Sequence, residues 1–154
     1  MSTSKIRLIL LILGVLILVA AGIAVLKRDK IADLILRGSD VSLADEAART
    51  SPQGKLALDF LGALRAMDKE AIAQIATAEQ IARIEQETQQ PSGDFQEMRT
   101  MMLDDLPADP GALRNKIKTV QTHGNRAVVL FETKANSWYV QLVQEDNAWK
   151  ISGF

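Results

Sequence analysis

Residues 126–154, RAVVLFETKANSWYVQLVQEDNAWKISGF, decide the fold of this chain. Apolar and polar side chains alternate along most of the stretch, and a period of two is typical of strands that bury one face. Trp138, Val140 and Leu142 share a face in this pattern, so that face is expected to line the core. The alternation predicts three short strands, over residues 126–134, 137–145 and 148–153.

A fourth strand is predicted directly before this stretch, over residues 116–122. The connections between the four strands are short and consist of residues that favour tight turns: His123-Gly124-Asn125, Ala135-Asn136 and Asp146-Asn147. Turns of this kind join neighbouring antiparallel strands. We therefore expect a meander in which the order of the strands in the sheet follows their order in the chain.

Residues 52–106 carry apolar side chains at helical rather than strand spacing. Leu56, Phe60 and Leu64 repeat on one helix face after Pro52, a residue favoured at the first position of a helix. Further helices are predicted to begin at three residues whose side chains cap helix N-termini: Asp68, Thr77 and Asp94. Helices followed by an antiparallel sheet indicate an α+β domain with the helices packed on one face of a curled sheet.

Nineteen consecutive residues near the N-terminus, 8–26 (LILLILGVLILVAAGIAVL), carry no charged or strongly polar side chain. A helix of this length spans roughly 28 Å, close to the thickness of the hydrocarbon core of a bilayer. We therefore predict a single transmembrane helix with a juxtamembrane extension that Gly38 ends. The chain is then divided into an anchor (1–37), a polar linker that can hold a short helical turn (38–51) and a soluble α+β domain (52–154).

The residues around the apolar run leave two questions open. Lys5 and Arg7 also match the start of a secretory signal peptide, but the run is longer than such peptides carry, which favours an uncleaved anchor. Basic residues flank both ends in nearly equal number and do not decide the orientation. Contact with the membrane surface is expected of Lys27, Arg28 and Lys30, and close approach of another helix at Gly14, Ala21 and Gly22.

Charge and cysteine content exclude several classes of function. The chain has 18 basic and 19 acidic residues and a net charge of -1, so it lacks the basic excess of a nucleic-acid-binding domain. It has no cysteine, which excludes disulfides, thiolate metal sites and a cysteine nucleophile. The sequence also lacks phosphate-binding glycine loops, nucleophile elbows and metal-binding histidine pairs, so we expect no cofactor and no metal.

The residues with suitable acid–base chemistry are poorly placed for catalysis. His123 is the only histidine and lies in a predicted turn, and Tyr139, the only tyrosine, lies on the strand face opposite Trp138. Asp59 lies beside the apolar stripe of the first predicted helix, where a base would need a raised pKa and a polar partner. We expect a hydrated surface carboxylate instead, and predict no catalytic residue.

Two clusters have both a functional and a structural interpretation. The first cluster consists of the acidic residues around Pro107, namely Asp104, Asp105 and Asp109. Their spacing lacks the alternating ligands and the glycine of a calcium loop, so a solvated helix end is the favoured interpretation. The second cluster consists of three methionines just before these residues, namely Met98, Met101 and Met102. Such side chains can form a pliable docking surface, but a methionine cluster more often belongs to a core.

Two stretches resemble the nuclear-transport-factor-2-like superfamily. Residues 56–76 (LALDFLGALRAMDKEAIAQIA) look like its first helix pair, and residues 126–154, above all the ending QEDNAWKISGF, look like its closing strands. The resemblance implies a cone-shaped fold in which a curved antiparallel sheet wraps around helices. Within the superfamily, the chain is similar to small membrane-attached members of uncharacterised function. Its plan is also similar to that of the inner-membrane assembly component of type IV secretion systems.

These resemblances imply a location and a function. In both groups the domain usually lies outside the cytoplasm, so we expect a single-pass protein of the bacterial inner (cell) membrane with its C-terminal domain in the periplasm. We expect a non-enzymatic assembly or accessory subunit of a membrane protein complex. The expected partners are the lipid bilayer, other membrane or periplasmic proteins and, as a further candidate, a second copy of the chain, but no nucleic acid.

Binding of a lipid or another hydrophobic ligand inside the cone is an alternative hypothesis. The residues expected to line either that cavity or a packed core are Phe60, Leu64, Val140, Leu142 and Trp149. An isomerase- or dehydratase-like enzyme that uses Asp59 as its base is a third hypothesis, and it requires Asp59 to be buried.

Overall fold

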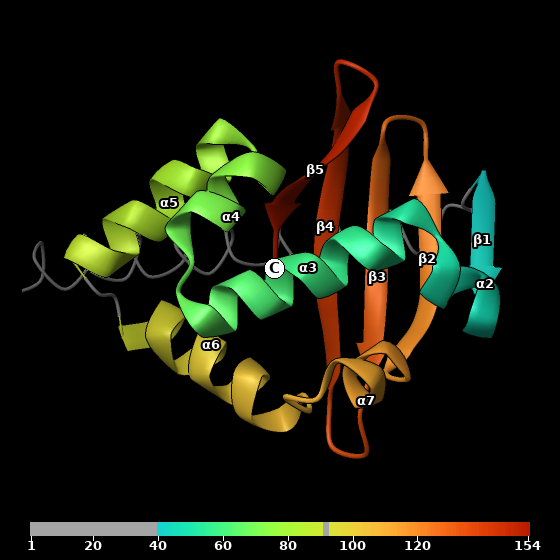
Figure 1. Cartoon of the computed structure of the whole chain (residues 1–154), viewed down its shortest axis with the longest axis horizontal. Helices are drawn as coiled ribbons and strands as arrows, with labels where there is room; N and C mark the ends of the chain where they lie inside the picture. The colour runs from blue at the N-terminus through green and yellow to red at the C-terminus, as the bar shows by residue number, and fades with distance from the viewer. Residues whose placement is uncertain (1–39, 91–92) are drawn as a thin grey trace, which may run out of the picture. The chain divides into compact units, whose positions relative to one another are not determined.

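A five-stranded antiparallel sheet dominates the computed structural model, which describes residues 40–90 and 93–154 (Figure 1). The strands lie in the sheet in their order along the chain, and each neighbouring pair is antiparallel. Their bounds are β1 Val41–Ala44, β2 Ile117–His123, β3 Arg126–Glu132, β4 Ser137–Glu145 and β5 Ala148–Gly153. The four strands of the predicted meander are β2 to β5, so the meander is confirmed.

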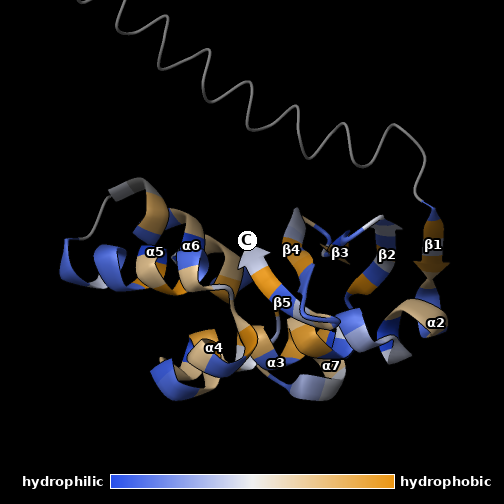
Figure 2. Cartoon of the chain, turned by 90° about the horizontal axis from the view of Figure 1, so that it is seen from above, coloured by the Kyte–Doolittle hydropathy of each residue, from blue (hydrophilic) through white to orange (hydrophobic). Residues whose placement is uncertain are grey.

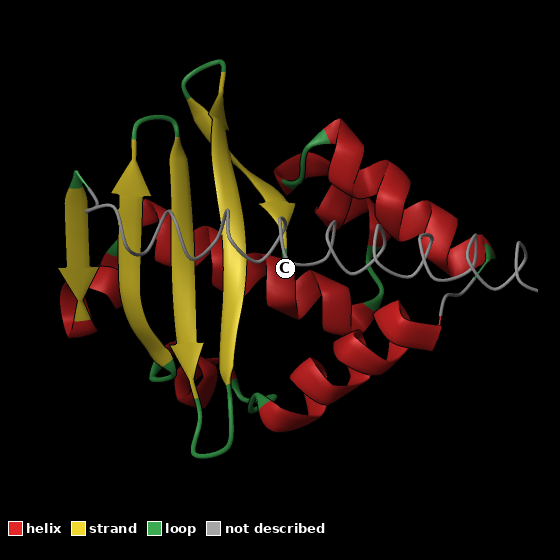
Figure 3. Ribbon diagram, turned by 180° about the vertical axis from the view of Figure 1, so that it is seen from behind, coloured by secondary structure: helices red, strands yellow, loops and turns green. Residues whose placement is uncertain are grey.

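Within the residues that the structure describes, six helices lie between β1 and β2 along the chain. Their bounds are α2 Asp45–Thr50, α3 Pro52–Ala66, α4 Lys69–Ile75, α5 Ala78–Gln89, α6 Gly93–Asp105 and α7 Pro110–Arg114. Helix α3 lies across one face of the sheet, and α4 and α5 lie beyond its β5 edge (Figures 1 and 3). The described residues belong to one compact unit, Ser39–Phe154. The predicted α+β class is confirmed.

The core lies between α3 and the sheet. Alternate residues of β3, namely Ala127, Val129 and Phe131, are almost completely buried, as the period of two requires. Figure 2 shows hydrophobic and hydrophilic residues alternating along the strands. Helix α3 contributes Phe60 and Leu61 to the same cluster. The two periodic patterns of the sequence, helical and alternating, therefore meet in one core.

Local side chains determine where several helices begin. Asp68 Oδ1 accepts a hydrogen bond from Ala71 N at 3.0 Å, and Thr77 Oγ1 accepts one from Gln80 N at 3.2 Å. Each bond satisfies a backbone donor that has no partner within the first turn. The caps predicted at Asp68 and Thr77 are confirmed. The helix predicted to follow Asp94 is α6, in which Asp94 is the second residue.

The segment predicted as a linker, residues 38–51, contains secondary structure from Val41 to Thr50. The short helical turn allowed there corresponds to α2, whereas the strand β1 was not predicted. These residues form β1, in which Leu43 pairs with Val120 of β2, and α2, whose Ala48 is fully buried in the core. Two apolar contacts are too few to give a periodic pattern, and β1 depends on a strand that is distant along the chain. This segment is therefore part of the domain.

Helix α7 is a second departure from the sequence prediction. The sequence patterns predicted no helix after residue 106, yet α7 follows the end of α6, and Pro110 is its first residue. Asp109 Oδ1 accepts a hydrogen bond from Ala112 N at 2.8 Å and caps this helix. Proline is favoured at the first helical position, because its fixed φ suits the helix and the first amide lacks a partner there in any case.

The turn between β4 and β5 has the geometry expected of its residues. Asp146 and Asn147 both have positive φ, 49° and 64°, as a type I′ turn requires. Asparagine and aspartate tolerate this conformation better than most other residues. The turn predicted from Asp146-Asn147 is confirmed.

The predicted transmembrane helix lies outside the described residues. So do the membrane-surface candidates Lys27, Arg28 and Lys30 and the helix-contact candidates Gly14, Ala21 and Gly22. Among residues 40–90 and 93–154, no helix combines the length and apolar character needed to cross a membrane.

Candidate functional site

The residues predicted to line a cavity or a core come together in the interior. Phe60 and Leu64 of α3 are at most 1% exposed. Val140 and Leu142 of β4 are equally buried and belong to the same packed cluster. Trp149 of β5 is partly buried against that cluster. These side chains form the core of the domain.

Phe154 occupies the space beside this core. The centroid of its ring lies 5.3 Å from that of Phe60 and 5.6 Å from that of Phe95 on α6. Tilted and edge-to-face contacts at such distances stabilise aromatic pairs beyond the burial of their area. The alternative hypothesis placed a ligand cavity next to Phe60. In the structure, the side chain of Phe154 fills this region instead.

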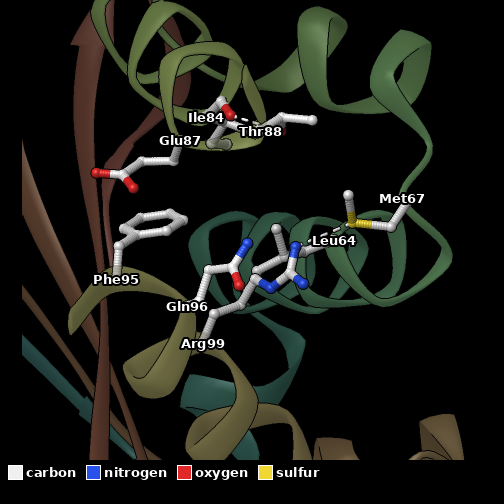
Figure 4. A pocket seen from close by; sticks show the side chains of 8 residues that line it. All are labelled: Leu64, Met67, Ile84, Glu87, Thr88, Phe95, Gln96 and Arg99. Carbon is white, nitrogen blue, oxygen red and sulfur yellow. Dashed lines mark hydrogen bonds between the residues drawn. The ribbon is translucent and has the colours of Figure 1, made fainter. Parts of the chain in front are cut away.

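A small pocket lies between the C-terminal half of α3, α5 and α6 (Figure 4). Leu64, Ile84 and Phe95, all buried, form its apolar wall. The rest of its lining is Met67, Glu87, Thr88, Gln96 and Arg99. Its volume is about 90 Å³, whereas pockets for drug-sized ligands measure roughly 300–1,000 Å³. The pocket therefore has room only for a small molecule.

Arg99 is the unusual polar group of this pocket. Its Nη1 donates a hydrogen bond to the thioether sulfur of Met67 at 3.1 Å, drawn as a dashed line in Figure 4. Its Nε is buried and has no hydrogen-bond partner among the described residues. Thr88, by contrast, donates its hydroxyl to Ile84 O at 2.8 Å within its own helix. Arg99 Nε is thus a donor that the described residues leave without a hydrogen bond.

The three residues considered for catalysis do not meet in the structure. Asp59 is exposed on α3, so the enzyme hypothesis that needed a buried base at Asp59 loses that base. His123 is exposed at the end of β2, with Nδ1 3.5 Å from Asp40 Oδ1. Tyr139 pairs with Leu130 of β3 and lies on the face opposite Trp138. Asp59 and His123 thus face solvent, and Tyr139 lies on the face of the sheet opposite the core.

The acidic residues near Pro107 act separately. Asp104 is exposed, Asp109 caps α7, and Asp105 binds the β3–β4 connection. Among the described residues, no group of three histidine or acidic side chains is close enough to hold a metal ion.

Asp105 is an anchor that the sequence analysis missed. Its Oδ2 accepts hydrogen bonds from Trp138 Nε1 at 2.6 Å, Thr133 Oγ1 at 2.8 Å and Asn136 Nδ2 at 3.2 Å. The bonds from Trp138 and Thr133 lower the pKa of Asp105, partial burial opposes them, and Asn136 and the charge of Lys116 add to the lowering. The carboxylate joins the end of α6 to the β3–β4 connection.

Arg65 also joins two elements, and no sequence motif predicted this role. Its Nη2 donates to Leu103 O at 2.9 Å and to Leu106 O at 3.0 Å. These carbonyls belong to the C-terminal end of α6 and the residue just after it, where carbonyl groups lack partners within the helix. The cation also compensates the negative end of the helix dipole. Arg65 therefore fastens α3 to α6.

The three methionines do not form one surface. Met102 is 2% exposed and belongs to the core, whereas Met101 is 51% exposed. Met98 is half-buried between these extremes. Only part of the cluster is thus accessible to a partner.

Comparison with known proteins adds no relative. No protein-family model matches the chain, and no curated protein or solved structure matches it.

Proposed function

We propose that this chain is a single-pass membrane protein whose domain acts as a non-enzymatic assembly or accessory subunit of a membrane protein complex. The observation that carries the proposal is the uncharged run of residues 8–26, which is long enough to cross the hydrocarbon core of a bilayer. Tethering raises the effective concentration of the domain toward other proteins of the same membrane. A role in binding neighbouring membrane proteins fits this arrangement.

The finer description of the fold is also a proposal: a nuclear-transport-factor-2-like cone. Three features support it, namely the helices before the meander, the placement of α3 across one face of the sheet, and the resemblance of residues 56–76 and 126–154. The groups that the chain resembles hold this domain outside the cytoplasm. The proposed location is therefore the bacterial inner membrane, with the domain in the periplasm.

Binding of a large hydrophobic ligand inside the domain receives less support. The candidate residues Phe60, Leu64 and Val140 are packed in the core. The Phe154 ring contacts the Phe60 ring in a tilted arrangement, so a ligand at that place would first have to displace Phe154. Interaction with a protein partner requires no such displacement.

Photo-crosslinking in the native membrane tests the proposal. A photoreactive residue replaces Val41 or Met101, which are 50% and 51% exposed. The full chain is expected to stay in the membrane after washing with alkaline carbonate and to form a discrete adduct with one other protein. The matched control carries the same photoreactive residues in a chain without residues 1–38, and is expected to lose both membrane retention and the adduct.

Each readout has an outcome that contradicts the proposal. Release of the full chain by carbonate would exclude the transmembrane anchor. Retention without an adduct at either position would exclude the accessory role. A topology reporter fused after Phe154 tests the periplasmic location, because activity of a cytoplasm-only reporter would reverse the proposed orientation.

A further inference from the structure

Met67 combines three unusual properties at the end of α3. Its backbone has a φ of 55°, in the left-handed region that residues other than glycine seldom adopt. It is 44% exposed although its side chain is apolar. Its sulfur accepts a hydrogen bond from Nη1 of Arg99 at 3.1 Å (Figure 4). Glycine or asparagine is favoured in this conformation at a helix end, so a methionine there indicates a use for the thioether.

The donor and the acceptor of this hydrogen bond are poorly matched. A thioether is a weak acceptor, whereas the guanidinium of Arg99 is a charged donor. Oxidation of the sulfur would remove the mismatch, because a sulfoxide is polar and its oxygen is a strong acceptor. Hydrogen bonds that include a charged group are roughly twice as strong as those between neutral groups. Arg99 is therefore placed to bind the oxidised form of Met67 more strongly than the reduced form.

The surroundings of Met67 admit a small oxidant. Besides its exposure, Met67 lines the pocket between α3, α5 and α6, which measures about 90 Å³. A site of roughly 10–15 Å³ already holds a water molecule, and hydrogen peroxide exceeds water by a single oxygen atom. The sulfur has two lone pairs, of which the bond from Arg99 occupies one. The other lone pair remains for reaction.

We propose that Met67 is a site of reversible oxidation by a peroxide, and that Arg99 holds the resulting sulfoxide. The free lone pair of the sulfur attacks one oxygen of hydrogen peroxide, so that an S–O bond forms while the O–O bond breaks. The leaving hydroxide takes up the proton of the transferred oxygen and becomes water. The sulfur loses two electrons, and the peroxide gains them. Methionine sulfoxide reductases reverse the change.

The sulfoxide is expected to strengthen the junction of two helices. Met67 follows the last residue of α3, and Arg99 belongs to α6. The three rotatable bonds of a methionine side chain allow the new oxygen to turn toward Nη1 of Arg99. A weak contact between α3 and α6 then becomes a strong one. This inference does not depend on the membrane-complex role proposed above.

Peptide mapping of the full chain in detergent, after treatment with hydrogen peroxide, tests the site. Trypsin cleaves after Arg65 and Lys69, and Met67 is the only methionine of the peptide between them. This peptide is expected to gain the mass of one oxygen. Met101, which is 51% exposed, reports the dose of oxidant, and Met102, which is 2% exposed, should stay unmodified at that dose. Fragmentation of their common peptide distinguishes these two residues.

The midpoint of thermal unfolding tests the role of Arg99. Oxidation is expected to raise the midpoint of the unmodified chain by about 2–6 °C, as for one strengthened hydrogen bond. Met101→Leu should show the same rise, and Met67→Leu should show none. Arg99→Leu should still be oxidised at Met67 but without a rise. Arg126→Leu, at an exposed position of β3, is its matched control and should keep the rise. Each variant is compared before and after oxidation, so that the effect of the substitution itself cancels.

Should Arg99→Leu fail to fold, Met67→Gln provides the test without oxidant. The amide oxygen of glutamine stands in for the sulfoxide oxygen as an acceptor for Arg99. Met67→Gln is therefore expected to unfold at a higher temperature than Met67→Leu. An equal or lower midpoint would contradict the proposal.

Four further results would overturn it. Met67 could stay unmodified at a dose that oxidises Met101, or its oxidation could leave the midpoint unchanged or lower it. The rise could also be equal in the unmodified chain and in Arg99→Leu. Finally, the oxidised chain could keep its added mass and its raised midpoint after treatment with methionine sulfoxide reductases and their reductant, which would exclude reversibility.

Discussion

Nε1 of Trp138 on β4 donates a hydrogen bond to Oδ2 of Asp105, the last residue of α6, across 2.6 Å. The same oxygen accepts from Thr133 and Asn136, so one carboxylate organises the β3–β4 connection. Hydrogen bonds to an ionised acceptor are about twice as strong as those between neutral groups. This contact fastens the helical layer to the sheet.

Asp105→Asn is expected to lower the midpoint of thermal unfolding, because the amide loses the charge and replaces one acceptor by a donor. Asp104→Asn, at the exposed neighbouring position, is the matched control and is expected to leave the midpoint nearly unchanged. Unfolding of the detergent-solubilised chain can be followed by tryptophan fluorescence. Equal midpoints for Asp105→Asn and Asp104→Asn would show that the network is dispensable.

The contribution of Asp105 to stability depends on pH. Its pKa in the folded protein lies below the ordinary value of 3.8, so the folded state binds the proton less readily than the unfolded state. The stabilisation is therefore fully present well above pH 3.8 and is lost as the pH falls toward the folded pKa. The difference in unfolding midpoint between the unmodified chain and Asp105→Asn should shrink as the pH falls from 6 to 3. A constant difference over this range would contradict the assignment.

Two glycines of α3 should respond in opposite directions to alanine. A Cβ on Gly54 would lie 2.3 Å from the carbonyl oxygen of Ala48, whereas a Cβ on Gly62 would meet no atom within 4 Å. Gly54→Ala is expected to cost about 1–3 kcal/mol through overpacking, and Gly62→Ala to stabilise by about 0.5–1 kcal/mol. Denaturant titration of both variants checks the sign. Stabilisation by both would show that α2 and α3 are not in close contact.

Arg65→Met retains the alkyl part of the side chain and removes both hydrogen bonds to the end of α6. The loss is expected to be about 1–3 kcal/mol, since two carbonyl groups lose their donor. Arg65→Lys keeps the charge and should lose less. Denaturant titration measures the difference, with Lys55→Met at an exposed position of the same helix as the control. A loss no larger than that of the control would count against the anchor.

Phe154→Ala is expected to destabilise the domain by about 3 kcal/mol, since Phe154 contacts the rings of Phe60 and Phe95. Phe154→Leu, which retains much of the volume, should cost less. The alanine variant should also gain stability when benzene is added, because an apolar cavity of that kind binds small aromatic molecules. Benzene should leave the thermal unfolding midpoint of the unmodified chain unchanged. The absence of destabilisation in Phe154→Ala would show that this ring does not fill the interior.

Thr77 shows how far local sequence reasoning reaches. Thr77-Ala78-Glu79-Gln80 matches a capping box, and Thr77 Oγ1 does accept from Gln80 N. The second half of the box would need the Gln80 side chain to bond to Thr77 N. That amide instead donates to Ile151 O on β5 at 2.8 Å, and the Gln80 side chain is buried. The cap was predictable, but the partner of Thr77 N was not.

The strands, the β4–β5 turn and most helix starts follow from patterns among neighbouring residues, because side-chain periodicity and φ preference are local properties. The roles of β1, Asp105, Arg65 and Arg99 follow from groups that are distant along the chain. Leu43 gains its place in the sheet from Val120, and Asp105 gains its donors from the β3–β4 connection. No local pattern encodes which distant groups will meet, so these contacts, and the pocket beside Arg99, emerge only when the chain has folded.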